Sequence, residues 1–260
     1  MGHVLRVSGL LRMLVLVDAL PTGEEYPDYI PDVFSTPDIL KEVGNPLTVN
    51  LFKKRGKKEL TELMHDIIVK LQGTPVGVIL HIECHGGNVR DNFKLGIKEE
   101  PYILVGSREV EDRVYFSELA PYLCTIYHLS KGMLLLNMSS CWGRDVWLGC
   151  LHLRHAPFTV CIAPDTAIAA SDLNDMNREF YRGLFSTSGN LGRFSKKYKR
   201  NVMLAEQVAN TLVNSAYTNT CFYRAGMGEL TIPIFMQFKR DYLKGASYVT
   251  TQSNQSSPPG

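Results

Sequence analysis

Hydrophobic residues gather in short runs that lack the polar alternation of a half-exposed strand. Such runs are Met13–Val17, Val76–Ile82, Met133–Met138 and Thr159–Ala163. Short runs that are rich in leucine or β-branched residues are typical of fully buried parallel strands. Between them lie segments with hydrophobic residues at helical three-four spacing. The pattern therefore predicts alternating strands and helices, and hence an α/β fold.

The same two periodicities predict the remaining elements. Helices are expected at Lys57–Leu71, Ser117–Ile126, Val146–Leu153, Asp172–Phe185 and Val202–Ala216. Further strands are expected at Leu47–Phe52 and, as an edge strand, at Leu230–Phe235, and a small hairpin at Tyr102–Val105 with Arg113–Tyr115. We therefore expect a mostly parallel sheet of about six strands between layers of helices.

Composition limits the classes of function. The chain has 260 residues, 45% of them hydrophobic, which suits one domain over residues 1–249, with a disordered polar tail at 250–260. With 28 basic and 26 acidic residues the net charge is +2, which does not favour nucleic acid as a partner. No run approaches the roughly 18 apolar residues of a membrane span. The 6 cysteines without Cys-x-x-Cys spacing indicate a reduced, cytoplasmic protein.

Two of the predicted strands end on chemically reactive residues. Val76–Ile82 leads into Glu83-Cys84-His85-Gly86-Gly87, and Met133–Met138 leads into Ser139-Ser140-Cys141-Trp142-Gly143. Ligands bind at the carboxyl ends of parallel strands, so His85 and Cys141 would meet if the strands are neighbours. A nearby histidine and free backbone amides favour a reactive thiolate. Each residue alone is compatible with an ordinary strand end, but the pair favours a cysteine nucleophile with its histidine.

Two other classes of site are disfavoured. A lipase-like α/β-hydrolase needs its histidine well downstream of the nucleophile, but the last histidine, His155, follows Cys141 by only 14 residues. Zinc ligands can be drawn from two sets, His81, Cys84 and His85, or Cys150, His152 and His155. Neither set has a convincing four-ligand spacing. We therefore expect neither a metal nor an organic cofactor.

The context of the two strand ends resembles a known family. A cysteine followed at two positions by glycine, with a histidine about 50 residues upstream, is close to the caspase signature. Only Cys141 and Gly143 match its local pattern. The chain more widely resembles CHAT domains, a branch of caspase-like proteins, over most of its length. The segments that carry this resemblance are Met13–Pro21, Leu80–Gly87 (LHIECHGG), Tyr115–Cys141 and Phe180–Leu184 (FYRGL).

The resemblance implies a caspase-hemoglobinase-like three-layer sandwich that cuts protein or peptide substrates as a cysteine endopeptidase. It implies that Cys141 attacks a peptide carbonyl and that His85 protonates the leaving amine. The N–H groups of Gly86 and Cys141 would hold the oxyanion.

The residues that would contact the substrate differ from the family pattern. Ser139 stands two positions before the cysteine, where caspases have glutamine and metacaspases aspartate. An acid after the following strand is also expected in the pocket, and the candidates are Asp165, Asp172 and Asp175. Such an acid would favour cleavage after arginine or lysine. Asp172 is equally placed to cap a helix that begins at Leu173.

Activation and the rival function follow from the same resemblance. CHAT domains usually sit beside modules that switch them on, so we expect an activating protein partner. A processed loop is expected at Ser186–Arg200. The alternative is a catalytically idle caspase-like module that binds or scaffolds other proteins, because fold does not establish function.

Overall fold

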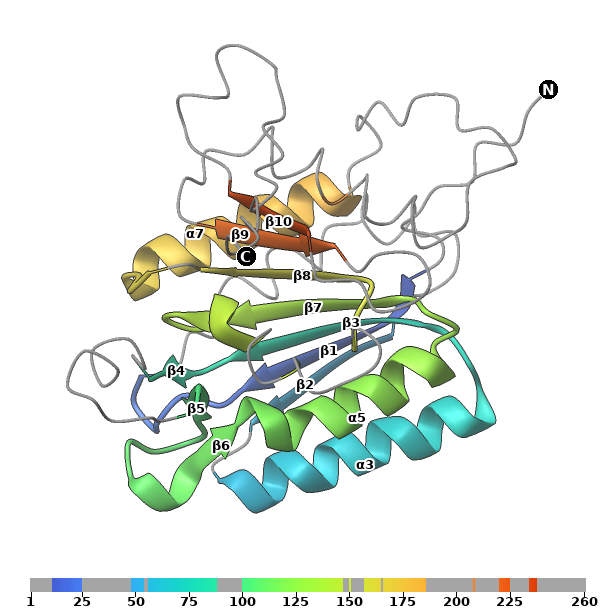
Figure 1. The fold of residues 1–260 in the computed structure, drawn as a ribbon, viewed down its shortest axis with the longest axis horizontal. Helices are drawn as coiled ribbons and strands as arrows, with labels where there is room; N and C mark the ends of the chain where they lie inside the picture. The colour runs from blue at the N-terminus through green and yellow to red at the C-terminus, as the bar shows by residue number, and fades with distance from the viewer. Residues whose placement is uncertain are drawn as a thin grey trace, which may run out of the picture.

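The computed structural model describes residues 11–24, 48–53, 56–87, 100–146, 150, 157–164, 166–185, 208, 220–224 and 234–237. They form a seven-stranded sheet in the order β10-β9-β8-β7-β3-β1-β2 (Figure 1). The strands are β1 (Leu11–Asp18), β2 (Thr48–Lys53), β3 (Gly77–Glu83), β7 (Leu134–Ser139), β8 (Val160–Pro164), β9 (Thr220–Arg224) and β10 (Ile234–Gln237).

The five strands from β2 to β8 pair in parallel, and β9 is antiparallel to both of its neighbours. The predicted mostly parallel α/β sheet is therefore confirmed. It has one strand more than the expected number, because β9 was not predicted. The predicted edge strand Leu230–Phe235 is shifted toward the carboxyl terminus, since β10 begins at Ile234.

Helices cover both faces of the sheet. On one face lie α3 (Lys57–Gly73) and α5 (Phe116–Leu129), and on the other lies α7 (Ala170–Phe185), as Figure 1 shows. The apolar stripe of α3 is buried, as its three-four spacing predicts. α5 begins one residue before the predicted Ser117, and the Glu118 carboxylate caps it by accepting the N–H of Tyr115 at 3.0 Å.

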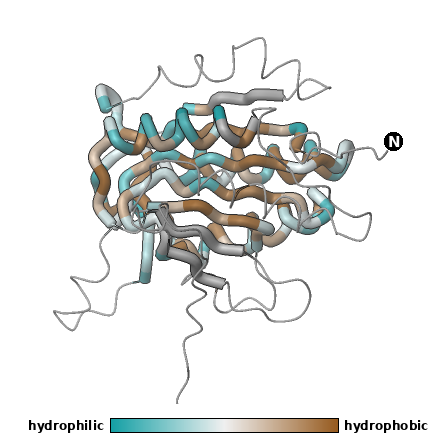
Figure 2. Tube along the Cα trace, turned by 90° about the horizontal axis from the view of Figure 1, so that it is seen from above, coloured by the Kyte–Doolittle hydropathy of each residue, from teal (hydrophilic) through white to brown (hydrophobic). Residues whose placement is uncertain are grey.

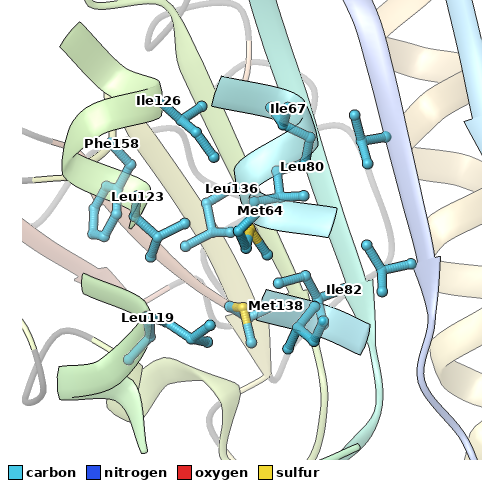
Figure 3. Close-up of a cluster of buried hydrophobic side chains, with 14 of the residues drawn as sticks. Met64, Ile67, Leu80, Ile82, Leu119, Leu123, Ile126, Leu136, Met138 and Phe158 are labelled. Carbon is cyan, nitrogen blue, oxygen red and sulfur yellow. The ribbon is translucent and has the colours of Figure 1, made fainter. Parts of the chain in front are cut away.

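The core between the sheet and the pair α3 and α5 combines alternate strand residues with the apolar faces of the two helices. Figure 2 shows the hydrophobic colour concentrated in the strands of the sheet. The labelled core residues of Figure 3 are Met64, Ile67, Leu80, Ile82, Leu119, Leu123, Ile126, Leu136, Met138 and Phe158. Each such side chain contributes about 1.5–3 kcal/mol when fully buried. Cys84 joins the same cluster, so it faces away from α7, as the alternation of side chains along a strand predicts.

A small antiparallel sheet extends the edge of the molecule where β3 ends. It contains β4 (His85–Gly86), β5 (Tyr102–Leu104) and β6 (Arg113–Tyr115). The predicted hairpin of the last two strands is confirmed. The chain passes from the large sheet into the small one through Cys84. His85 therefore stands at the junction between the two sheets.

Several predictions fall outside the described residues. These are most of the helices Val146–Leu153 and Val202–Ala216, the loop Ser186–Arg200 and the tail 250–260. Directly after Cys141 the chain forms a short 3-10 turn, η3 (Gly143–Asp145). Within the described part of the chain, no helix combines the length and the hydropathy needed to cross a membrane.

Candidate active site

The register between β3 and β7 leads directly to His85 and Cys141. His81 pairs with Asn137, and Glu83 pairs with Ser139. The N–H of Cys84 donates to the Ser139 carbonyl at 3.2 Å, so the pairing continues past the last paired residue of β3. Both pairs join residues 56 positions apart, and the same separation holds for His85 and Cys141. His85 and Cys141 therefore stand level with each other, two positions beyond the last pair of the two strands.

Gly86 lies directly against the backbone of Cys141. A Cβ atom built at Gly86 would lie 1.7 Å from the carbonyl oxygen of Cys141 and 2.9 Å from its carbonyl carbon. Only a residue without a side chain allows this close approach of two backbones. The strand end that carries His85 and the turn that carries Cys141 are therefore in contact, at the carboxyl edge of the sheet.

A tight turn after β7 presents the thiol of Cys141. Trp142 has a φ of 58° and ψ of 19°, the left-handed conformation that bulky residues rarely adopt. Its N–H donates to the Thr166 carbonyl at 3.2 Å, which holds the turn to the segment before α7. The half-buried Cys141 Sγ lies 3.7 Å from the carbonyl oxygen of Ile168 in the same segment. The thiol thus faces the chain that enters α7.

Two backbone N–H groups beside the thiol are not used by the sheet or the turn. The N–H of Gly87 donates to the Tyr102 backbone carbonyl at 3.2 Å. Hydrogen-bonded pairs alternate along an antiparallel ladder, so the next pair, Gly86 with Ile103, is not hydrogen-bonded. The N–H of Gly86 therefore points away from β5. In the turn, Ser140 and Gly143 donate internally, whereas no described residue accepts a hydrogen bond from the N–H of Cys141. These are the two donors that the sequence analysis assigned to an oxyanion.

His85 contacts a carboxylate that the sequence analysis did not select. Its Nε2 lies 2.7 Å from Oε2 of Glu24, and the guanidinium of Arg108 lies 3.0 Å from both carboxylate oxygens. Hydrogen bonds from Arg108, which has the larger effect, and from His85 lower the pKa of the Glu24 carboxyl below its usual value. The sequence analysis assigned no functional residue to the region after β1. Its Pro-Thr-Gly-Glu sequence, a turn motif directly after a strand, is the signal that was available.

Ser139 is buried within a polar cluster between the sheet and α7. Its Oγ donates to Asn137 Oδ1 at 3.1 Å and accepts from Asn177 Nδ2 at 3.0 Å. Asn137 Nδ2 donates to Asn177 Oδ1 at 3.0 Å and to the Tyr181 hydroxyl at 3.2 Å. The Tyr181 hydroxyl in turn donates to His81 Nδ1 at 2.8 Å. Together, these five residues fix the end of β7 relative to α7.

Burial lowers the pKa of His81 to about 3. Its Nδ1 lies 3.2 Å from Nδ2 of Asn137, an amide nitrogen that can only donate, so Nδ1 accepts this hydrogen bond and the ring is neutral. Nε2 of His81 lies 3.9 Å from the buried carboxylate of Glu83 on the same strand face. His81 therefore serves the packing of α7 against the sheet.

The predicted pocket acids lie on or before α7. Asp172 is exposed in the first turn of the helix, which begins at Ala170, so the alternative that it caps a helix starting at Leu173 is wrong. Asp175 is exposed and forms an ion pair with Arg178 at 2.8 Å. Neither carboxylate forms a hydrogen bond or ion pair with His85 or Cys141 among the described residues. Asp165 lies outside the described residues.

The candidate zinc ligands do not assemble among the residues that the structure describes, since no three His, Cys, Asp or Glu side chains there are placed to hold a metal ion. His152 and His155 lie outside those residues. In the other set Cys84 faces the hydrophobic core, where burial raises the pKa of its thiol.

Comparisons with known proteins identify the fold. No protein-family model matches the chain, and no curated protein matches its sequence. Among solved structures, the chain is similar to the crystal structure of the Drosophila initiator caspase Dronc. The TM-score is 0.52 at 8% identity, over 84% of this chain and 81% of that chain. The chain therefore has a caspase-like fold.

Proposed function

We propose that the chain is a caspase-like cysteine endopeptidase in which Cys141 is the nucleophile and His85 its acid and base. The observation that carries this proposal is the register of β3 and β7, whose paired residues have the same separation as His85 and Cys141. The close approach of Gly86 to the Cys141 backbone supports it, because that contact brings the two strand ends together. The caspase-like fold supports it at the level of architecture.

The proposed reaction uses groups already described. The Cys141 thiol gives its proton to His85, and the thiolate forms a bond to the carbonyl carbon of the substrate. The N–H groups of Gly86 and Cys141 donate to the developing oxyanion. The C–N bond breaks as His85 returns the proton to the leaving amine. Water then hydrolyses the thioester, with His85 taking the proton from water and passing it to the departing thiolate.

The specificity proposal concerns the acids near α7. We propose cleavage after arginine or lysine, with Asp172 as the first candidate for the carboxylate that contacts the basic residue, followed by Asp165 and Asp175. Asp172 is four residues beyond Ile168, whose carbonyl lies beside the Cys141 thiol. We place Ser139 behind the pocket rather than at its surface, because its side chain is buried. Membership of the CHAT branch, a cytoplasmic location and an activating protein partner belong to the same proposal.

The alternative function is an idle caspase-like binding module. One observation favours it, because the Cys141 thiol donates to the Ile168 carbonyl, a bond that the thiolate cannot make. If this contact persists when a peptide is bound, the sulfur keeps its proton in the bond to Ile168 and does not attack the peptide. The two functions therefore differ in the reactivity of one sulfur atom.

Covalent labelling separates the two functions. Peptidyl acyloxymethyl ketones carrying arginine, aspartate or leucine next to the reactive group are incubated with the intact protein, and the labelled residue is located by peptide mass spectrometry. We expect label on Cys141, fastest with arginine, and none on Cys141→Ala or His85→Gln. Cys124→Ser is the matched control, since Cys124 is a half-buried cysteine on α5 and should leave the labelling rate unchanged.

The labelling results distinguish the peptidase from the binding module and also test the basic specificity. A folded protein that none of the three probes labels at Cys141 contradicts the peptidase and supports the binding module. Labelling that is fastest with aspartate or leucine keeps the peptidase and contradicts the basic specificity.

A further inference from the structure

Three segments of the chain meet at the carboxylate of Glu24, at the carboxyl edge of the sheet. Glu24 comes from the turn after β1, His85 from the end of β3, and Arg108 from the loop after β5. The carboxylate of Glu24 lies between the other two, 2.7 Å from His85 Nε2 and 3.0 Å from the guanidinium of Arg108. A side-chain contact between residues 61 positions apart is a feature of the fold and not of local sequence.

The turn that carries Glu24 is built by the backbone. Glu24 N–H donates to the Pro21 carbonyl at 3.0 Å, and Gly23 between them has a φ of +91°. A β-turn with positive φ at its third position favours glycine there. Before the turn, the N–H of Ala19 donates to the Glu83 backbone carbonyl at 2.8 Å, and the Ala19 carbonyl accepts from the N–H of Gly106 at 2.7 Å. The backbone that leads into the Glu24 turn is thus held to the end of β3, the strand that leads into His85.

The loop that carries Arg108 is fixed as well. Val105 N–H donates to the Asp112 carbonyl at 3.1 Å, and the Ser107 hydroxyl bonds to the Asp112 carboxylate. Glu109 N–H donates to Ser107 Oγ at 3.0 Å. These bonds on either side of Arg108 fix the backbone of the loop from which its guanidinium reaches Glu24.

The charges define which nitrogen of His85 can react. Glu24 is a carboxylate at neutral pH, since hydrogen bonds from Arg108 and His85 lower the pKa of its carboxyl, so it acts only as an acceptor and Nε2 of His85 carries the shared proton. In the neutral ring the proton is then on Nε2, and Nδ1 is the basic atom. A carboxylate in this position also fixes the orientation of the imidazole ring.

We propose that Glu24 is a positioning residue for His85, held in place by Arg108, so that Nδ1 exchanges the proton of Cys141. This inference rests on the proposed function, since it assigns a role within the same site. The thiol proton moves to Nδ1 as the C–S bond forms, and it moves from Nδ1 to the amine nitrogen as the C–N bond breaks. Glu24 remains ionised throughout and keeps the Nε2 proton in its hydrogen bond.

A purely structural ion pair makes a different prediction. Glu24 and Arg108 are substantially exposed, with 36% and 66% of their side chains accessible, and such pairs contribute little to stability. If Glu24 served only this pair, its replacement would change neither turnover nor the state of the His85 ring. Stability, turnover and ring tautomer therefore separate the two roles.

The kinetic test compares Glu24→Gln with the natural chain on the peptide that labelling identifies as preferred. We expect kcat to fall at least about 10-fold, while KM changes less than about threefold, because the variant loses orientation and charge rather than substrate contacts. Arg108→Gln should lower kcat in the same direction by a smaller factor. Glu62→Gln is the matched control, since Glu62 is an exposed carboxylate on α3 that faces Lys58 at 3.8 Å, and kcat should not change.

A spectroscopic test decides the inference even in a chain without turnover. Nitrogen NMR shifts of the imidazole, assigned by comparison with His85→Gln, should show the proton on Nε2 in the natural chain. Glu24→Gln should show a mixture of the two tautomers. Unchanged kcat together with an unchanged tautomer in Glu24→Gln would overturn the role of Glu24. Lack of labelling at Cys141 with an Nε2–H ring that depends on Glu24 would instead contradict the peptidase and leave the positioning intact.

Discussion

At the scale of single residues, the contact between Gly86 and Cys141 tests whether the two strand ends act together. In Gly86→Ala the new methyl group meets the Cys141 carbonyl, so either strand end must move. We expect the free energy of unfolding to fall by about 1–3 kcal/mol and labelling of Cys141 to be lost. Urea denaturation and the labelling rate measure the two effects.

A glycine with open surroundings provides the control. Gly73 ends α3, and a Cβ atom there would meet no atom within 4 Å. Gly73→Ala should leave labelling unchanged and raise the free energy of unfolding by up to about 1 kcal/mol. Equal labelling rates in Gly86→Ala and Gly73→Ala would mean that the contact is irrelevant to the thiol.

Sequence reasoning found the candidate residues that stand at strand ends and missed the one that stands on a loop. His85 and Cys141 each follow a short, strongly hydrophobic run, so their position in the fold could be inferred from the pattern. Glu24 could not be inferred in this way, because its contact depends on a β-turn and on loops 61 and 84 positions away. Side-chain contacts between loops are set by tertiary packing and leave no periodic signal.

At the scale of elements, the polar cluster beneath β7 is expected to hold α7 against the sheet. Tyr181→Phe removes the hydroxyl that donates to His81 and accepts from Asn137, and it leaves both partners buried without that bond. We expect a loss of about 1–3 kcal/mol in the free energy of unfolding, measured in urea.

The matched substitution lies on another helix. The hydroxyl of Tyr122 on α5 lies 3.5 Å from Nε2 of His65, at the long limit of a hydrogen bond. Tyr122→Phe should change stability by less than about 0.5 kcal/mol. Comparable losses in the two variants would show that the cluster does not hold α7.

A strand could be predicted from the sequence where one of its two faces is strongly apolar. β3 and β7 were recognised as buried strands although their α7 faces carry His81, Glu83, Asn137 and Ser139. Hydrogen bonding within the cluster makes this polar face compatible with burial. β9 was missed because its five residues, Thr220–Arg224, include polar ends and stand outside any long apolar run.

At the scale of the whole molecule, His81 links folding to pH. The ordinary histidine pKa is 6.5, and burial lowers the pKa of His81 to about 3. Between these values the unfolded chain binds a proton that the native chain does not. The stabilisation from burying neutral His81 is therefore complete above about pH 6.5. Below that pH the free energy of unfolding falls by about 1.4 kcal/mol per pH unit.

The measurement is the pH slope of the free energy of unfolding between pH 4 and pH 7, in the natural chain and in His81→Gln. The variant should have a shallower slope, whatever its stability at neutral pH. Two titratable groups that contact His81, Tyr181 on α7 and Glu83 on its own strand, are present in both chains. Identical slopes would mean that the native ring takes up its proton near pH 6.5.

The architecture of the molecule followed from alternating elements, but the reversal of strand direction near one edge of the sheet did not. Parallel pairing from β2 to β8 is the arrangement expected of buried strands joined by helical crossovers. The reversal of direction at β9 depends on how later segments return to the sheet. Hydropathy does not encode strand direction, so this edge could not be assigned.

The register that aligns His85 with Cys141 also makes folding accuracy a chemical variable. A slip of β7 by one position against β3 would move Cys141 by about 3.3 Å and turn its side chain to the opposite face. A misregistered molecule could keep much of its secondary structure and still have no working thiol. If Cys141 reacts as proposed, the fraction of chains titrated by a tight covalent probe counts the correctly paired strands, and circular dichroism of the same sample would not reveal the difference.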